Sequence, residues 1–234
     1  MKYVLLLASF ILCLISCNKT NIDLKTSVQN PQISINPISD SCSYTINGMQ
    51  FICDKPYGEG RVNAYANFDV TTNNWDSDTL QYRTMFGFYK ASNPSAENDG
   101  HVIIHFVKKY PKNQLIKPIL GILAPVTDTP LYVKGTRNYA VDFDRFNSQN
   151  GIALEVVNRT GTSTETLLTF IYASRFAATT LNNDCQSNSQ FEILNMYKDS
   201  DGRNIIEAKF TSNLFDKFEN LKRLENGYMR IHVE

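Results

Sequence analysis

Apolar and polar residues alternate with a period near two along most of the chain from about residue 41 onwards. Successive side chains of a strand point to opposite faces, so this alternation is typical of strands that bury one face. The runs that predict strands are Val62–Val70, Leu80–Lys90, His101–Val107, Tyr139–Phe143, Ile152–Val157, Thr166–Tyr172, Phe191–Tyr197, Ile205–Phe210 and Tyr228–Val233. Gly, Asn, Asp and Pro separate them. The pattern predicts an all-β domain, an antiparallel β-sandwich or a partly closed barrel.

A hairpin is predicted at the start of this region, around Asn47-Gly48. Asn-Gly is the strongest short hairpin signal because both turn positions take positive φ. Folding about it pairs Ile46 with Met49, Tyr44 with Phe51, and Cys42 with Cys53. The paired cysteines would lie ~5.5 Å apart at Cα, within the range of a disulfide. We expect a Cys42–Cys53 bridge that leaves Cys185 unpaired, with buried free thiols as the alternative.

One short helix is predicted near the C-terminus, between Ser212 and Gly227. Ser212 or Asn213 is a suitable N-cap, and glycine commonly follows the last turn of a helix. Its apolar stripe would consist of Leu214, Phe218, Leu221 and Phe215. Asn226-Gly227 is also a hairpin signal, so a turn between strands is the alternative.

The first residues have the pattern of a secretory signal. Lys2 precedes the apolar run Val4–Ile15, which is shorter than the ~20 residues of a membrane-spanning helix. The run ends in Leu14-Ile15-Ser16-Cys17, which resembles the lipobox of bacterial lipoproteins. That resemblance implies cleavage after Ser16 and attachment of acyl chains such as palmitate to Cys17, enough for stable anchoring. An ordinary cleaved signal with an accidental cysteine is the alternative.

Three segments follow from these patterns: a signal peptide over 1–16, a lipidated cysteine and flexible tether over 17–40, and a single all-β domain over 41–234. The tether is rich in Asn, Thr, Ser, Gln and Pro and has no strand or helix periodicity. Asn18-Lys19-Thr20 contains neither the aspartate that retains lipoproteins at the inner membrane nor an acidic surface-display run. By resemblance, this favours the periplasmic face of the outer membrane.

The charge of the chain argues against nucleic acid as a partner. The 23 Lys and Arg residues balance the 23 Asp and Glu residues, and loss of Lys2 with the signal leaves a net charge near −1. Nucleic-acid binding is driven by neutralisation of phosphates, which needs a clustered basic surface.

Motifs for catalysis or cofactors are scarce. The chain has no nucleophile elbow, zinc-protease motif, phosphate loop or dinucleotide fingerprint, so we expect no cofactor and no metal. Asp142 and Asp144 would share one strand face at ~7 Å, the kind of carboxylate pair that glycosidases use. They are the only candidates for a hydrolase, and an exposed strand face explains the same alternation.

The single tryptophan suggests a binding loop. Trp75 is flanked by Asn74 and Asp76, and an aromatic plane among amides and carboxylates suits stacking against a sugar. The alternative is a tryptophan that folds back as a lid on the core.

Taken together, the lipobox, the polar tether, the Ile46-Asn47-Gly48 hairpin and the final Asn226–Ile231 strand resemble small lipoproteins of unknown function of the Bacteroidetes type. These motifs transfer no reaction. The leading hypothesis is a non-catalytic protein, lipid-anchored in the bacterial cell envelope, whose β-domain binds a glycan or an envelope protein. The rival is an envelope or polysaccharide hydrolase that uses Asp142 and Asp144.

Overall fold

The computed structural model describes residues 40–69, 74–89, 98–116, 123–160, 163–171 and 179–233. Within these ranges it does not describe the side chains of 57–77, 98–99 and 159–160. The predicted signal over 1–16, Cys17 and nearly all of the tether lie outside the described residues. Every described residue belongs to one compact unit, Ile38–Glu234.

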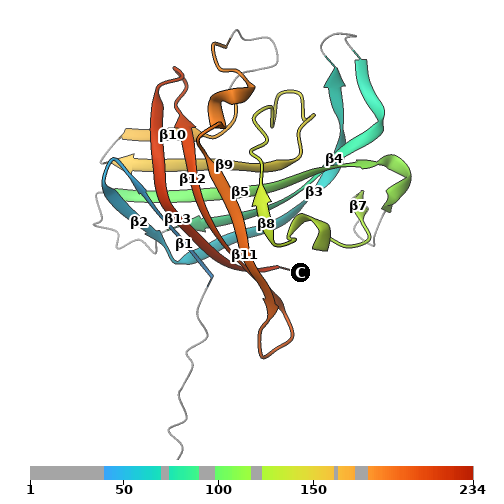
Figure 1. Cartoon of the computed structure of the whole chain (residues 1–234), viewed down its shortest axis with the longest axis horizontal. Coiled ribbons are helices and arrows are strands. Elements are labelled where there is room, and N and C mark those ends of the chain that lie inside the picture. The colour runs from blue at the N-terminus through green and yellow to red at the C-terminus, as the bar shows by residue number, and fades with distance from the viewer. Residues whose placement is uncertain are drawn as a thin grey trace, which may run out of the picture. The chain divides into compact units, whose positions relative to one another are not determined.

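The described residues form strands and short 3₁₀ turns (Figure 1). The strands are β1 Ser41–Ile46, β2 Met49–Cys53, β3 Lys55–Asp69, β4 Asn74–Tyr89, β5 Asn98–Pro111, β6 Leu115–Ile116, β7 Ala124–Pro125, β8 Gly135–Arg137, β9 Gly151–Thr160, β10 Ser163–Leu168, β11 Gln190–Lys198, β12 Asn204–Phe215 and β13 Leu221–Val233. The 3₁₀ turns are η2 Lys112–Gln114, η3 Thr129–Leu131 and η4 Asn183–Gln186. The prediction of an all-β domain is confirmed.

One antiparallel sheet, nearly closed into a barrel, contains most of these strands. Its strand order is β2-β1-β13-β12-β10-β9-β5-β4-β3, and β11 pairs with both β12 and β8. The contact between β10 and β12 is the narrowest part of this path, because Leu168 and Phe215 are its only paired residues. Of the two predicted architectures, the partly closed barrel is the one observed.

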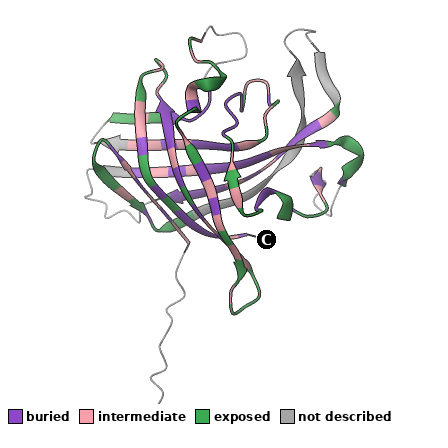
Figure 2. Ribbon diagram, in the orientation of Figure 1, coloured by how far each residue is buried: buried purple, intermediate pink, exposed green. Residues whose placement is uncertain are grey.

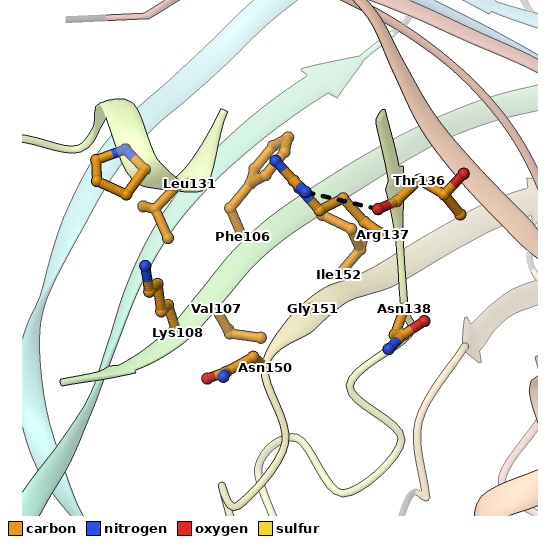
Figure 3. A pocket seen from close by; sticks show the side chains of 11 residues that line it. Phe106, Val107, Lys108, Leu131, Thr136, Arg137, Asn138, Asn150, Gly151 and Ile152 are labelled. Carbon is orange, nitrogen blue, oxygen red and sulfur yellow. Dashed lines mark hydrogen bonds between the residues drawn. The ribbon is translucent and has the colours of Figure 1, made fainter. Parts of the chain in front are cut away.

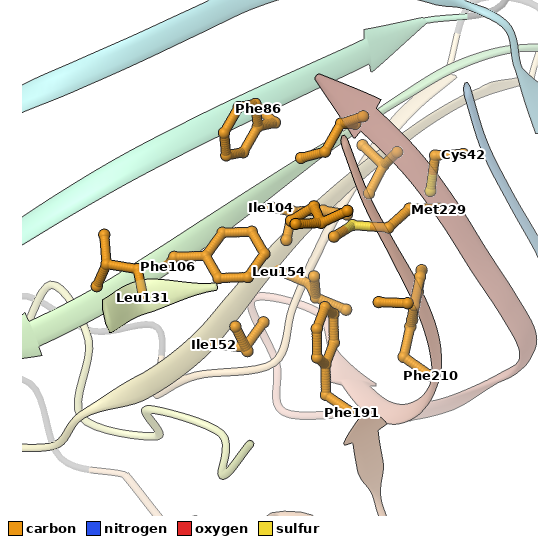
Figure 4. Close-up of a cluster of buried hydrophobic side chains, with 14 of the residues drawn as sticks. Cys42, Phe86, Ile104, Phe106, Leu131, Ile152, Leu154, Phe191, Phe210 and Met229 are labelled. Atoms are coloured by element: carbon orange, nitrogen blue, oxygen red, sulfur yellow. The ribbon is translucent and has the colours of Figure 1, made fainter. Parts of the chain in front are cut away.

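The barrel is filled by side chains from both halves of the sheet (Figures 2 and 4). Phe106 of β5 packs edge-to-face against Phe86 of β4 and Phe191 of β11, each with ring centroids 5.9 Å apart. Tyr132, which follows η3, packs against Phe106 at 5.2 Å. Aromatic pairs of this kind add about 0.5–1.5 kcal/mol each beyond burial. Phe106 therefore connects β4 and β5 to β11, which belongs to the sheet through β12.

A second, smaller core lies on the other side of β5 and β9, under the turn that covers residues 141–146. It consists of Val107, Ala140, Phe143, Ala153, Leu168 and Phe170. The prediction of a strand over Tyr139–Phe143 is therefore wrong beyond Tyr139, whose backbone forms a single parallel bridge to Ile152. The apolar residues of this segment are buried by a turn that folds over the sheet, and periodicity alone does not distinguish that arrangement from a strand.

The predicted hairpin register is confirmed. Strands β1 and β2 pair Ile46 with Met49, Tyr44 with Phe51, and Cys42 with Cys53. Asn47 and Gly48 have φ values of 52° and 76°, as the two-residue turn requires.

The predicted C-terminal helix is wrong, because Ser212–Phe215 end β12 and Leu221 begins β13. Buried Asn213 explains the difference: its backbone N–H donates to the Gln186 side chain at 3.0 Å, and its amide donates to the carbonyl of Cys185 at 2.8 Å. These tertiary hydrogen bonds favour the extended strand over the local helix preference. Asp216 then closes the turn by accepting a backbone hydrogen bond from Asn220 at 2.9 Å.

The alternative turn at Asn226-Gly227 is also not observed. Both residues lie inside β13, at an irregularity in its pairing with β1 and β12. Asn226 takes φ 52°, and a Cβ on Gly227 would lie 2.4 Å from the ring of Phe210. The Asn-Gly pair therefore permits a bulge and a close ring contact.

Candidate functional site

A pocket of about 280 Å³ lies between the β5–β9 ladder and the segment that contains η3 and β8 (Figure 3). Its lining residues are Phe106, Val107, Lys108, Pro130, Leu131, Thr136, Arg137, Asn138, Asn150, Gly151 and Ile152. They come from four separate stretches of the chain, which the sheet brings together.

Gly151 allows the wall of this pocket to form. It begins β9 with φ 147°, and a Cβ at this position would lie 2.1 Å from the carbonyl oxygen of Asn138. Because no side chain intervenes, the Ile152 N–H donates to that carbonyl and the Ala140 N–H donates to the Ile152 carbonyl, both at 2.8 Å. These bonds fix Asn138 beside the start of β9.

The floor of the pocket is apolar and its rim is polar. Phe106, Leu131 and Ile152 are buried, at 1%, 5% and 1% exposure. The polar lining side chains are Lys108, Thr136, Arg137, Asn138 and Asn150. A concave site with an apolar base and a few convergent polar groups is the usual form of a small-ligand site.

Two cations belong to this rim. Arg137 points from β8 toward Phe106, and its guanidinium donates to the carbonyls of Val133 and Thr136 (Figure 3). Partial burial lowers the pKa of Arg137. The ammonium of Lys108 lies over the ring of Tyr110, 5.1 Å from its centroid.

No carboxylate lines the pocket. Within the described part of the chain, neither Lys108 nor Arg137 forms an ion pair with an acidic side chain. A guanidinium has five N–H donors, and the two carbonyls take only part of that capacity. The lining side chains therefore carry positive charge and no negative charge.

A second hollow of about 350 Å³ lies beside the narrow junction of β10 and β12. It is lined by Ser163, Thr164, Glu165, Thr166, Leu168, Asp216, Lys217 and Phe218. Here the charges are compensated, because the Lys222 ammonium lies 2.6 Å from both carboxylate oxygens of Glu165. This ion pair joins β13 to β10 where the backbone ladder is missing.

The two aspartates of the predicted hydrolase site have different surroundings, and neither lines the two pockets. Asp142 is buried, and its carboxylate accepts the backbone N–H groups of Ser148 at 2.9 Å and Gln149 at 3.1 Å, as well as the Ser148 hydroxyl. Asp144 is exposed, with φ 63°. Asp142 thus holds its own loop closed, and the arrangement gives the hydrolase hypothesis no support.

The other predicted site residues are only partly described. Asn74, Trp75 and Asp76 begin β4, where their backbones pair with Asp69, Phe68 and Asn67 of β3. Their side chains lie outside what the structure describes, as does all of Cys17. The stacking role of Trp75 and the lipidation of Cys17 remain predictions.

Cys42, Cys53 and Cys185 are not joined by a disulfide in the structure. Cys42 and Cys53 are opposite one another and buried, and burial together with the proximity of Cys53 raises the pKa of Cys42. Cys185 lies apart in η4, and burial raises its pKa to about 11. The register places the two cysteines as the bridge requires, and the disulfide itself remains a prediction.

On the outer side of the sheet, a buried histidine pairs with a partly exposed glutamate. His105 Nε2 is 3.0 Å from a carboxylate oxygen of Glu155, and the imidazole packs on Phe143 with centroids 4.8 Å apart. Burial lowers the pKa of His105, and this effect outweighs the opposing influence of Glu155. The hydrogen bond from His105 lowers the pKa of Glu155.

The cationic pocket has no recognisable signal in the sequence. Lys108, Arg137, Asn138 and Asn150 follow no motif, and polar residues at strand ends and in loops are common. Gly135 and Gly151, with φ values of 122° and 147°, mark the segments that form the pocket. The two positive charges come together only when β8 packs beside the start of β9 in the folded chain.

The fold and the pocket define a class: an all-β domain with a nearly closed barrel and a small polar pocket that is lined by two cations and no carboxylate. No family profile, no curated protein and no solved structure matches this chain. In the described ranges, no group of three His, Cys, Asp or Glu residues is placed to hold a metal ion. Nor does any helix there have the length and apolar character needed to cross a bilayer.

Proposed function

We propose that this chain is a non-catalytic protein, lipid-anchored in a bacterial cell envelope, whose β-domain binds a glycan in the pocket between β5, β8 and β9. The observation that carries this proposal is the pocket itself, which combines side-chain amides and a hydroxyl with an apolar floor. Amides can both donate to and accept from sugar hydroxyls, and the apolar face of a sugar ring packs on apolar side chains.

The chemistry of the lining favours binding over catalysis. Its polar side chains are those of Lys108, Thr136, Arg137, Asn138 and Asn150, without a carboxyl, imidazole or thiol group. General acid–base catalysis at neutral pH most often uses His, Asp or Glu. The proposed lipid anchor is based on the lipobox and its Cys17.

A glycan array tests the proposal, using full-length lipidated protein in detergent. We expect specific binding by the wild type and loss of most of it in Asn138→Ala, whose side chain lines the pocket at an exposed position. Trp75→Ala is the comparison variant, because it tests whether the glycan binds instead at the predicted binding loop. Binding lost only in Trp75→Ala would move the site to that loop, and no glycan bound by any of the proteins would contradict the proposal.

A further inference from the structure

We propose that the ligand of the pocket between β5, β8 and β9 carries a carboxylate, so that the preferred ligand is an acidic sugar of the uronic acid type. This inference rests on the proposed glycan-binding function and specifies its ligand. It depends on two cations that reach one pocket from different elements, Lys108 from β5 and Arg137 from β8 (Figure 3).

Among the described residues, the two cations of the pocket have no acidic partner. Cations on protein surfaces are commonly balanced by nearby Asp or Glu, as Lys222 is by Glu165 at 2.6 Å. Among the described residues, Lys108 contacts an aromatic ring and Arg137 donates to two carbonyls. Neither cation contacts a carboxylate there. An anion bound there would supply that charge, with the guanidinium able to donate a pair of hydrogen bonds.

The size and lining of the pocket suit a sugar ring. A volume of about 280 Å³ lies just below the ~300–1,000 Å³ that is typical for drug-sized ligands, so it suits about one sugar ring. The apolar floor of Phe106, Leu131 and Ile152 suits the C–H face of such a ring. Asn138 and Asn150 then lie at the rim. Asn150 Oδ1 accepts the backbone N–H of Lys109 at 2.6 Å, so this side chain offers chiefly its amide N–H groups to a hydroxyl, whereas Asn138 offers an amide N–H and a carbonyl.

The surroundings of the two cations favour a carboxylate over a phosphate. Phosphate sites are usually built from successive backbone N–H groups at the N-terminus of a helix or in a nest. The helical element at this pocket is η3, which has only three residues. Side-chain cations with an amide rim and an apolar base suit a singly charged carboxylate on a ring better.

Matched sugars test the inference on the full-length lipidated protein in detergent. The probes are glucuronic and galacturonic acid, their oligosaccharides, and the carboxyl-reduced counterparts of each, with binding measured by calorimetry. We expect at least one acidic sugar to bind about tenfold or more tightly than its reduced counterpart, the range of a charge-assisted hydrogen bond. This preference should weaken as salt is added. Comparison of the single sugars with the oligosaccharides shows whether the ligand is a free sugar acid or a unit of a polymer.

The variants connect the preference to the pocket. Lys108→Gln removes one cation and should remove most of the difference between acidic and reduced sugars. Lys198→Gln makes the same change at an exposed lysine of β11 outside the pocket and should preserve it. An equal loss in both variants would overturn the inference, because it would show a nonspecific effect of net charge.

The remaining outcomes separate the inference from the proposed function. Equal affinity for acidic and reduced sugars, lowered in Asn138→Ala, would overturn the carboxylate preference and leave the glycan pocket standing. Inorganic phosphate that displaces the sugar more effectively than acetate does would also overturn it. Failure of every sugar to bind would contradict both proposals.

Discussion

At the scale of single residues, several polar side chains of this protein stabilise loops in places where the sequence suggested chemistry. Asp142 is the main example. Its carboxylate accepts hydrogen bonds from Ser148 and Gln149, so the turn over the second core depends on it. A buried carboxylate that satisfies several donors is costly to remove, because the donors then lose both water and their partner.

Asp142→Ala should therefore destabilise the protein by about 2–4 kcal/mol, as measured by urea unfolding. Asp144→Asn is the matched control: it keeps a residue that tolerates the positive φ of 63° and should change stability by less than ~0.5 kcal/mol. An Asp142→Ala protein as stable as the wild type would contradict the structural role. A glycan-cleaving activity lost in Asp144→Asn would instead revive the hydrolase hypothesis.

The pair formed by His105 and Glu155 predicts a pH dependence of stability. Burial lowers the pKa of His105 from 6.5, so the unfolded chain takes up a proton that the folded protein resists as the pH falls below 6.5. The pKa of Glu155 is lowered from 4.5 by its hydrogen bond with His105, so its contribution is present above 4.5 and is lost as the pH falls through the folded-state pKa. Both residues make the fold less stable in acid.

Unfolding free energies measured from pH 8 to pH 4 should therefore fall with decreasing pH, beginning near 6.5. One proton contributes a slope of at most ~1.4 kcal/mol per pH unit. His105→Gln should flatten the profile just below pH 6.5, because this side chain does not titrate. Parallel profiles for wild type and variant would show that His105 does not contribute.

At the scale of elements, the sequence predicted those structures whose local signal and tertiary environment agree. The β1–β2 hairpin was predicted to the residue because the turn, the alternation and the cysteine positions all specify one register. The segment from Ser212 to Gly227 failed because buried Asn213 bonds to distant η4, information that a local window does not contain. The strand prediction for Tyr139–Phe143 failed because Ala140 and Phe143 enter a second core that the strand pattern did not reveal.

The hairpin also carries the disulfide prediction. In an oxidising envelope, opposite buried cysteines should form a Cys42–Cys53 bridge, which closes a short loop and contributes about 2–3 kcal/mol. Peptide mapping without reduction should recover the two cysteines in one linked fragment and Cys185 in an unlinked one. Reduction should lower the unfolding free energy of the wild type and leave that of Cys42→Ala/Cys53→Ala unchanged. A linked fragment that contains Cys185 would contradict this pairing.

At the scale of the whole molecule, the fold class could be predicted, whereas the site could not. Alternation specifies strands and a buried face, but the pocket depends on which loop packs beside which strand. Lys108 and Arg137 lie far apart in the sequence. Only the packing of η3 and β8 against β5 and β9 brings them to one pocket. The candidates chosen from the sequence were residues close together along the chain, such as Asp142 and Asp144, because a sequence shows only proximity along the chain.

The beginning of the domain is fixed to its last strand. The Asp40 carboxylate accepts the backbone N–H of His232 at 3.1 Å and also contacts the imidazole, whose other nitrogen lies 3.1 Å from Asp199. Asp40, the last residue of the predicted tether, is therefore held beside β13 by polar contacts with His232.

The lipid anchor is the prediction that decides where this barrel operates. If Cys17 carries acyl chains, each buried methylene contributes ~0.8 kcal/mol, and several chains together hold a protein at a membrane where a single chain is marginal. In cells given labelled palmitate, the wild type should take up label and sediment with membranes. Cys17→Ser should remain an unprocessed precursor without label, because serine offers no thiol for attachment. Cys185→Ser is the control and should behave as the wild type does. Label in Cys17→Ser, or its absence from the wild type, would contradict the lipobox assignment and leave the barrel as a binding domain without this anchor.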